Sequence, residues 1–140
     1  MSPPDICDRG IAQVIEAMKN RSLDRLICMT AIGVGNSQGH GTWMFRHAIR
    51  PLMLGRIFKD RENQEAKVMR SGLGWTIVRP AKLIDGAATG RYRTAIGLGD
   101  LIAKPITRAE VADFLVQVAG DTEAYVHQTP LVDEPASTSE

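Results

Sequence analysis

Two short apolar runs constrain the fold of this chain more than any other feature. They are "RLICMTAI" at residues 25–32 and "WTIVRP" at residues 75–80, both rich in aliphatic residues. Apolar runs without alternating polar residues are typical of parallel strands whose two faces are covered by helices. Pro80 ends the second run, because proline cannot continue a strand ladder. The sequence therefore predicts a parallel sheet, and we expect the two runs to lie side by side in it.

Helical periodicity before and between these runs completes an α/β pattern. The first helix is expected over residues 10–19. Residues 43–70 are helical in pattern, but Pro51 and Gly55 interrupt them, so we expect two pieces, the second over 59–70. The first helix should bury the face that carries its apolar residues at helical spacing, namely Ile11, Val14, Ile15 and Met18.

The C-terminal third contains a clear helix start. In "TRAE" at residues 107–110, Thr107 can accept from the backbone of Glu110 while Glu110 reaches back, which is a capping box. A helix over 108–119 follows. Its inward face should carry the apolar residues that recur at helical spacing, namely Val111, Phe114, Leu115 and Val118.

The remaining segments are expected to form short strands, loops and a tail. Residues 81–105 contain many glycines and predict a surface loop with one short strand over 92–96. A last strand is expected over 125–132, followed by a disordered polar tail at 133–140. We therefore expect a single domain over residues 1–132.

Composition excludes several classes of protein. The chain has 140 residues and a formal net charge of +1, so we expect neither a nucleic acid nor an anionic membrane as partner. Its N-terminus lacks the features of a secretory signal, and no apolar run is long enough for a membrane span, which favours a soluble cytoplasmic protein. Cys28 lies in an apolar run and is expected to be buried. The three histidines have no ligand spacing, so no metal site is expected.

The glycine-rich segment "AIGVGNSQGHG" at residues 31–41 resembles a dinucleotide-binding loop, but it does not match the fingerprint. The fingerprint requires G-x-G-x-x-G and an acidic residue about 20 positions later. Gly33, Gly35 and Gly39 are spaced one residue too widely, and the region 20 positions on is "PLML". This segment is therefore not interpreted as a pyrophosphate loop.

Four segments resemble the atypical short-chain dehydrogenases, a group that includes NmrA-like regulators, flavin reductases and biliverdin-IXβ reductases. The most specific is "SGLGWTIVRP" at residues 71–80, supported by "RAEVADFLV" at 108–116. The resemblance covers most of the chain from Gly10 to Val132. It implies a partial Rossmann-like domain, α/β with a parallel sheet and flanking helices, that lacks the N-terminal Gly-rich βαβ unit. It also implies that residues 31–41 form a loop beside the nicotinamide, although a plain flexible turn remains an alternative.

The resemblance also implies which residues could contact a cofactor. Arg61 occupies the place of the family's lysine, Ile57 that of its tyrosine, and Glu65 follows as an acid. No catalytic residue is assigned, because an isoleucine cannot donate a proton. Arg79 could be a ligand or a donor to loop carbonyls, and Lys82 is a candidate ligand although a lone loop lysine is more often a solvated surface residue. The implied cofactor contacts beside Arg61 follow the two apolar runs, at Thr30, Ala31, Ile32, Pro80, Ala81, Lys82 and Leu83.

The function that the resemblance implies is NAD(P)-linked redox chemistry. We expect NADP or NAD to bind weakly or in part, with NAD(P)H-dependent reduction of a flavin, quinone or similar small-molecule substrate. The alternatives are a non-catalytic NmrA-like regulatory module and a truncated relative that is active only in an assembly. Residues 25–32 would present an unpaired strand edge, so we expect a homo-oligomer, a separate partner that covers this edge, or a rearranged topology.

Overall fold

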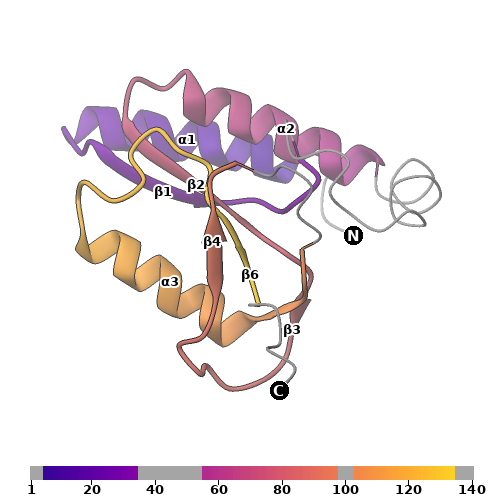
Figure 1. Ribbon diagram of the computed structural model, residues 1–140. Coiled ribbons are helices and arrows are strands. Elements are labelled where there is room, and N and C mark those ends of the chain that lie inside the picture. The colour runs from indigo at the N-terminus through magenta and orange to yellow at the C-terminus, as the bar shows by residue number, and fades with distance from the viewer. Residues whose placement is uncertain (1–4, 35–54, 98–102, 135–140) are drawn as a thin grey trace, which may run out of the picture.

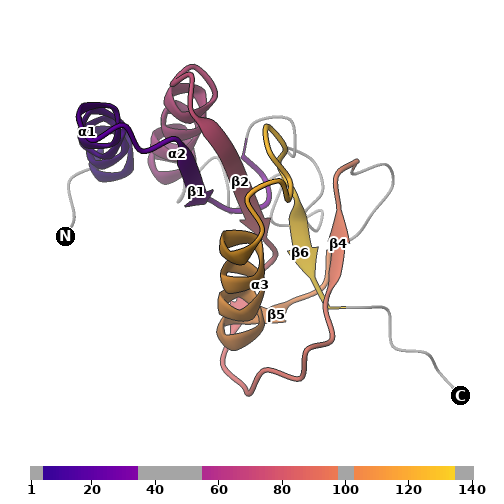
Figure 2. The same ribbon diagram turned by 90° about the vertical axis from the view of Figure 1, so that its left-hand side faces the viewer.

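The computed structural model describes residues 5–34, 55–97 and 103–134, which form a twisted sheet between helices (Figures 1 and 2). The four-stranded sheet has the order β1-β2-β6-β4. Its strands are β1 (Arg25–Met29), β2 (Gly74–Pro80), β6 (Leu131–Asp133) and β4 (Arg93–Ala95). The strands β1, β2 and β6 are parallel, and β4 is antiparallel to β6. The fold class predicted from the sequence is confirmed.

The two apolar runs lie side by side, as predicted. Ile27 pairs with Thr76, and Met29 pairs with Val78. The pairing continues beyond the end of β1, because the backbone N–H of Thr30 donates to the carbonyl of Val78 at 2.9 Å. The two strands therefore end at a common rim of the sheet, and ligands of α/β proteins bind outside such carboxyl ends.

Helices cover the two faces of the sheet unequally. The helices α1 (Ile6–Asn20) and α2 (Gly55–Met69) lie together on one face, and α3 (Arg108–Gly120) lies on the other (Figure 2). Neighbouring residues of β2 contact opposite layers, with Ile77 in the core under α1 and α2 and Val78 in the core under α3. This alternation follows from the two-residue repeat of a strand. Both layers thus depend on β2.

Coverage of β1 differs from the expectation that helices bury both of its faces. Leu26 and Cys28 are buried in the core under α1 and α2, whereas Met29 is 39% exposed. Among the described strands, β1 lies at the end of the sheet, away from the centre of the α3 layer. Cys28 is buried, as expected, and burial raises the pKa of its thiol to about 11, so it stays protonated at neutral pH.

The helices begin and end close to the predicted positions, with differences that packing explains. The helix α1 begins at Ile6, four residues earlier than predicted, because its first amides find a partner on α2. Val14 was expected on the inward face but is 45% exposed. In α3, Thr107 accepts from the backbone of Glu110 at 3.1 Å, as the capping box predicts. The first helical piece expected between residues 43 and 54 lies outside the described residues.

The region after β2 contains more strand than predicted. A second sheet pairs β3 (Leu83–Ile84) in parallel with β5 (Ile106–Thr107). The short strand expected over 92–96 is confirmed as β4, whereas the strand expected over 125–132 is wrong for most of its length. Tyr125 and His127 adopt left-handed φ angles of 55° and 56°, which no strand allows. Asp133, assigned to the tail from the sequence, belongs to β6.

Candidate functional site

The ends of β1 and β2 bring together most of the residues implied as cofactor contacts. Ile32 donates its N–H to the carbonyl of Pro80 at 3.0 Å, and Ala81 donates to the carbonyl of Val132 at 3.0 Å. Three neighbouring segments, 30–32, 80–81 and 131–132, are thereby joined at one rim. Parallel strands produce this arrangement because their carboxyl ends lie at the same edge of a sheet.

A buried ion pair supports the backbone at the rim. The guanidinium of Arg79 donates to both carboxylate oxygens of Glu65, with Nε at 3.0 Å and Nη2 at 2.7 Å. Both side chains are almost inaccessible to solvent, at 2% and 4% exposed. The hydroxyl of Thr30 donates to the same carboxylate at 2.6 Å. This cluster ties α2 to the last residues of β1 and β2.

Sequence analysis noted Glu65 and Arg79 separately but did not pair them. The available signal was Arg79 alone, a charged residue inside the apolar run at 75–80 that must be paired if it is buried, whereas Glu65 lies in a mostly polar helix pattern. For Thr30 the structure gives a more specific position than the sequence did. Thr30 is 3% exposed as a whole residue, its hydroxyl donates to Glu65 and its N–H donates to Val78, so it supports the rim and presents little surface to a ligand.

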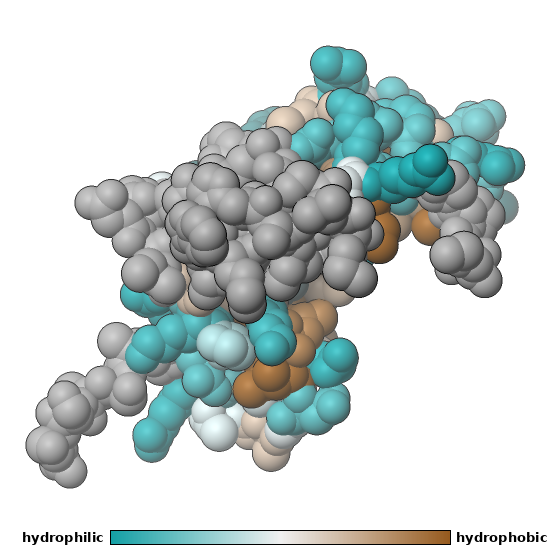
Figure 3. Space-filling view, turned by 90° about the vertical axis from the view of Figure 1, so that its right-hand side faces the viewer, coloured by the Kyte–Doolittle hydropathy of each residue, from teal (hydrophilic) through white to brown (hydrophobic). Residues whose placement is uncertain are grey.

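The other implied contacts differ in their access to solvent. Ala31 and Ile32 are half-buried at the rim, Pro80 and Ala81 are buried, and Leu83 packs against the α3 core from β3. Lys82 is exposed, and its carbonyl accepts from the N–H of Ile106 at 2.9 Å. The face onto which the strands open carries hydrophobic side chains among hydrophilic ones in its described part (Figure 3).

Arg61 lies on α2, one turn before Glu65, and is half-buried. Its charge contributes to a lower pKa at Asp60 and opposes the increase in thiol pKa at Cys7 and Cys28. Cys7, Cys28 and Asp60 belong to α1, β1 and α2, respectively. The structure therefore places Arg61 beside the contact between these elements. Ile57, where the resemblance implies a tyrosine, is 52% exposed on the same helix.

A second carboxylate on α2 caps the N-terminus of α1. The oxygens of Asp60 accept from the N–H groups of Cys7 at 2.9 Å and Asp8 at 2.8 Å. Burial opposes the charge of Asp60, but these donors outweigh it and lower its pKa. Lys67 adds an ion pair to Asp8 at 2.7 Å. Sequence analysis missed this contact, because the cap comes from a residue far away in the chain.

The glycine-rich segment is described only as far as Val34. Gly33 has a φ of 91°, a backbone conformation that favours glycine, and Val34 is completely buried. The chain thus turns sharply within the rim, immediately after the segment that pairs with β2. The remaining residues of the segment, His40 included, lie outside the described residues.

Within the described ranges, no three His, Cys, Asp or Glu residues are grouped as a metal site would require. The helices described here are also too short or too polar to span a bilayer.

Comparison with known proteins identifies the family. The NAD(P)H-binding family model matches residues 1–122. ChuY from E. coli CFT073 is similar in structure, with a TM-score of 0.75 and 26% identity over 92% of this chain and 62% of that one. ChuY from E. coli O157:H7, described as an anaerobilin reductase, gives a TM-score of 0.79 and 24% identity over 96% of this chain and 62% of that one.

A putative NADH-flavin reductase from Streptococcus pneumoniae TIGR4 has the same fold. Its TM-score is 0.68 with 20% identity, over 96% of this chain and 68% of that one. No curated protein matches the chain. The chain spans 62% of the length of both ChuY structures. The family model and the shared fold show that this chain belongs to the NAD(P)H-binding family and is of the atypical short-chain dehydrogenase/reductase type.

Proposed function

We propose that residues 30–32 and 80–83, at and beside the rim, bind the nicotinamide end of NADH or NADPH. We further propose that the chain takes part in reducing a flavin, quinone or similar electron-poor ring. The observation that carries this proposal is the continuous pairing of the two segments, in which Thr30 and Ile32 donate to Val78 and Pro80. The pairing fixes the edge where ligands of this fold class bind.

The residues of the rim suit a flat, uncharged ring. Ala31 and Ala81 are small, so they leave room for a ring near the backbone, and Ile32 adds an apolar surface that excludes water. The buried contacts among Thr30, Glu65 and Arg79 hold this backbone in place, and such preorganisation contributes to catalysis when geometry limits the rate. Arg61 and Lys82 are candidates for contacts to the ribose or a phosphate.

The proposed reduction requires little from the protein beyond positioning the cofactor against the acceptor ring. Bound NAD(P)H supplies a hydride, which carries two electrons to the acceptor ring. Reduction is completed by one proton, which water can provide to an exposed flavin or quinone. A tyrosine acid is therefore unnecessary, in agreement with Ile57 at the position that the resemblance assigns to it. Reduction of a simple ketone would need such an acid.

Binding and turnover can be tested separately. We expect NADPH or NADH fluorescence to report a dissociation constant on the order of 100 μM or lower, and absorbance to report its oxidation when FMN or a quinone is added. Ile32→Trp should fill the rim and weaken binding at least about tenfold. Val116→Trp is the matched control, because Val116 is 71% exposed on α3, away from the rim.

Three results would contradict all or part of the proposal. Absence of binding for both cofactors would favour a non-catalytic regulatory module, or a chain that is active only in an assembly. Equal effects of the two tryptophan variants would place the cofactor elsewhere. Binding without oxidation of any acceptor would support the proposed cofactor site but contradict the proposed reductase activity.

A further inference from the structure

A cavity lies between α3 and β4. It measures about 300 Å³. Tyr125, at one end of it, accepts a hydrogen bond at its carbonyl from Thr76 near the start of β2. The cavity thus extends from the turn at Tyr125, beside the start of β2, to Thr94 on β4, which pairs with Val132. Its lining residues are Tyr92, Thr94, Phe114, Gln117, Val118, Asp121, Ala124 and Tyr125.

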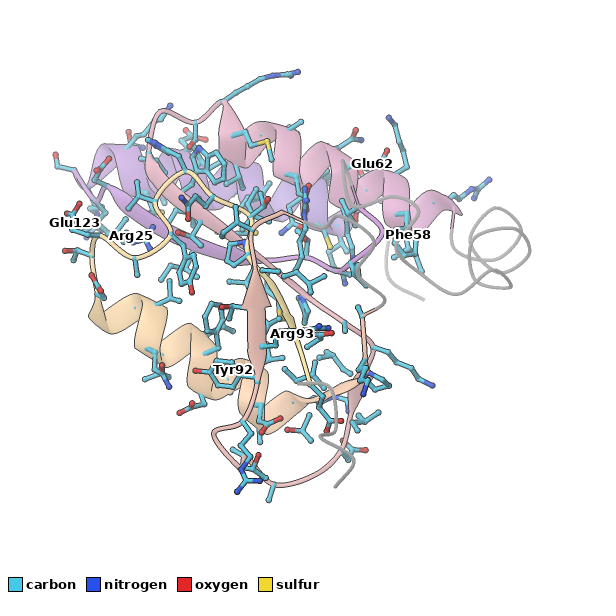
Figure 4. All side chains as sticks on the ribbon, viewed as in Figure 1. Arg25, Phe58, Glu62, Tyr92, Arg93 and Glu123 are labelled. Carbon is cyan, nitrogen blue, oxygen red and sulfur yellow. The ribbon has the colours of Figure 1, made fainter. Side chains whose placement is uncertain are left out.

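Three aromatic rings form the wall of this cavity. The ring of Phe114 makes edge contacts with Tyr92 and Tyr125, with centroids 5.6 Å apart in both pairs. Tyr92 lies between α3 and β4, as Figure 4 shows. Edge contacts of this kind fix the orientation of aromatic rings. The cavity therefore has a rigid aromatic lining.

The backbone that carries one of these rings is strained. Tyr125 has a φ of 55°, and His127, two residues later, has a φ of 56°. Left-handed conformations cost a non-glycine residue on the order of 1 kcal/mol each. The turn is nevertheless held by hydrogen bonds, since Tyr125 accepts from Thr76 at 2.7 Å and His127 donates its N–H to Trp75 at 2.7 Å. Strain of this kind concentrates at functional sites.

The charged side chain in the lining of the cavity is acidic. Asp121 contributes an exposed carboxylate, and Glu123 lies on the same turn. Burial raises the pKa of Tyr92, and the nearby carboxylate of Asp113 raises it further, so the phenol stays neutral. A positive charge lies behind the same turn, because the guanidinium of Arg25 donates to the carbonyl of Ala124 at 2.7 Å. Asp121 is therefore the group that would favour a cation in the cavity.

We propose that this cavity binds a small organic cation, an ammonium group on a compact apolar body, between the aromatic rings and Asp121. Aromatic rings attract cations, and a carboxylate within reach adds charge complementarity. A volume near 300 Å³ is at the lower limit of ligand pockets and suits a ligand of few atoms. The site is independent of the cofactor proposal.

Choline and its neutral isostere 3,3-dimethylbutan-1-ol provide the test. We expect choline to shift the ring proton resonances of Tyr92 and Tyr125 with a dissociation constant on the order of 1 mM, and the isostere to bind at least about fivefold more weakly. Asp121→Asn should weaken choline binding about fivefold or more. Asparagine still accepts from the N–H of Glu123, the contact that Asp121 makes at 3.0 Å, so the turn is kept.

Glu123→Gln is the matched control, because this carboxylate lies on the same turn but outside the cavity lining. It should leave choline affinity within about twofold of the original, since an exposed charge outside the site is screened by solvent. Equal binding of choline and the alcohol would overturn the proposal. So would equal losses in the two carboxylate variants, or no resonance shift at concentrations of about 100 mM.

Discussion

Glu65 and Arg79 form the most buried ion pair of the described residues. Their charges are separated from water on α2 and β2, and Thr30 supplies a further hydrogen bond to the carboxylate. Such a pair need not stabilise a protein relative to apolar residues, but loss of one partner leaves the other charge buried and unpaired. Substitution of one partner should therefore lower the free energy of unfolding much more than replacement of both partners by uncharged residues.

Glu65→Gln should lower the free energy of unfolding by about 3–5 kcal/mol, because the Arg79 charge loses its partner. The double variant Glu65→Gln with Arg79→Met should recover much of this loss, because no buried charge remains. Denaturant unfolding followed by circular dichroism measures both changes. Glu16→Gln, at an exposed position on α1, serves as the control. A loss below about 1 kcal/mol in the first variant would contradict this interpretation.

At the scale of elements, α3 is fixed to the chain before β4 through one carboxylate. Glu110 is 2% exposed and accepts from the hydroxyl of Thr89 at 2.6 Å and from the N–H groups of Thr89 at 3.1 Å and Arg91 at 3.4 Å. The hydrogen bonds from Thr89 and Arg91 lower its pKa, although burial acts in the opposite direction. The first turn of α3 therefore anchors residues 89–91.

This anchor should depend on pH. A carboxyl whose pKa is lowered by folding stabilises the protein above its ordinary pKa of 4.5, and this stability is lost as pH falls through the lower folded value. We expect the protection of the amides of Thr89 and Arg91, measured as their exchange rate relative to the intrinsic rate at each pH, to fall below about pH 4.5, before protection is lost in β2. Glu110→Gln keeps an acceptor but loses the charge, so it should lower the protection of these amides already at neutral pH and lose about 1–3 kcal/mol of stability.

Protection of the Thr89 amide that stays constant across this pH range in the original protein would show that Glu110 does not hold this segment. Glu16→Gln again provides the control, because it removes an exposed carboxylate from α1 without touching α3.

Local sequence signals predicted the elements that bury a regular apolar face. The parallel pairing of β1 with β2 and the position of α3 followed from such patterns, whereas α2 begins at Gly55, which was expected to interrupt the helix, and buries polar side chains such as Glu65. The strand expected at residues 125–132 failed because an apolar pattern does not show that Tyr125 and His127 take left-handed conformations. For the site, the rim was predictable, but contacts between distant polar residues, such as Glu65 with Arg79 and Asp60 with α1, have no periodic signal.

At the scale of the whole molecule, β1 lies at one end of the described sheet. Thr30 directs its N–H toward β2, so in an alternating strand the backbone groups of Ile27 and Met29 point to the opposite side. Met29 is also 39% exposed. An apolar edge of this kind favours pairing with another strand. We propose that a strand of a second copy covers it, while a different partner chain remains the alternative.

Light scattering of the purified chain at micromolar concentration tests this proposal. We expect a mass above that of the 15.3 kDa monomer, and Met29→Lys should shift the chain toward monomer, because lysine discourages pairing at strand edges. Val116→Lys, which places the same charge on an exposed position of α3, should leave the mass unchanged. A monomeric original chain would count against self-association and favour a different partner.

The carboxylate of Asp60 links the folding of α1 to that of α2. Asp5, at the start of α1, makes no side-chain hydrogen bond to the helix, whereas the amides of Cys7 and Asp8 are satisfied from α2. A solitary helix of 15 residues is marginal in water, and one without a cap is weaker still. We therefore expect α1 to remain unwound during synthesis until α2 has been made and docks beside it.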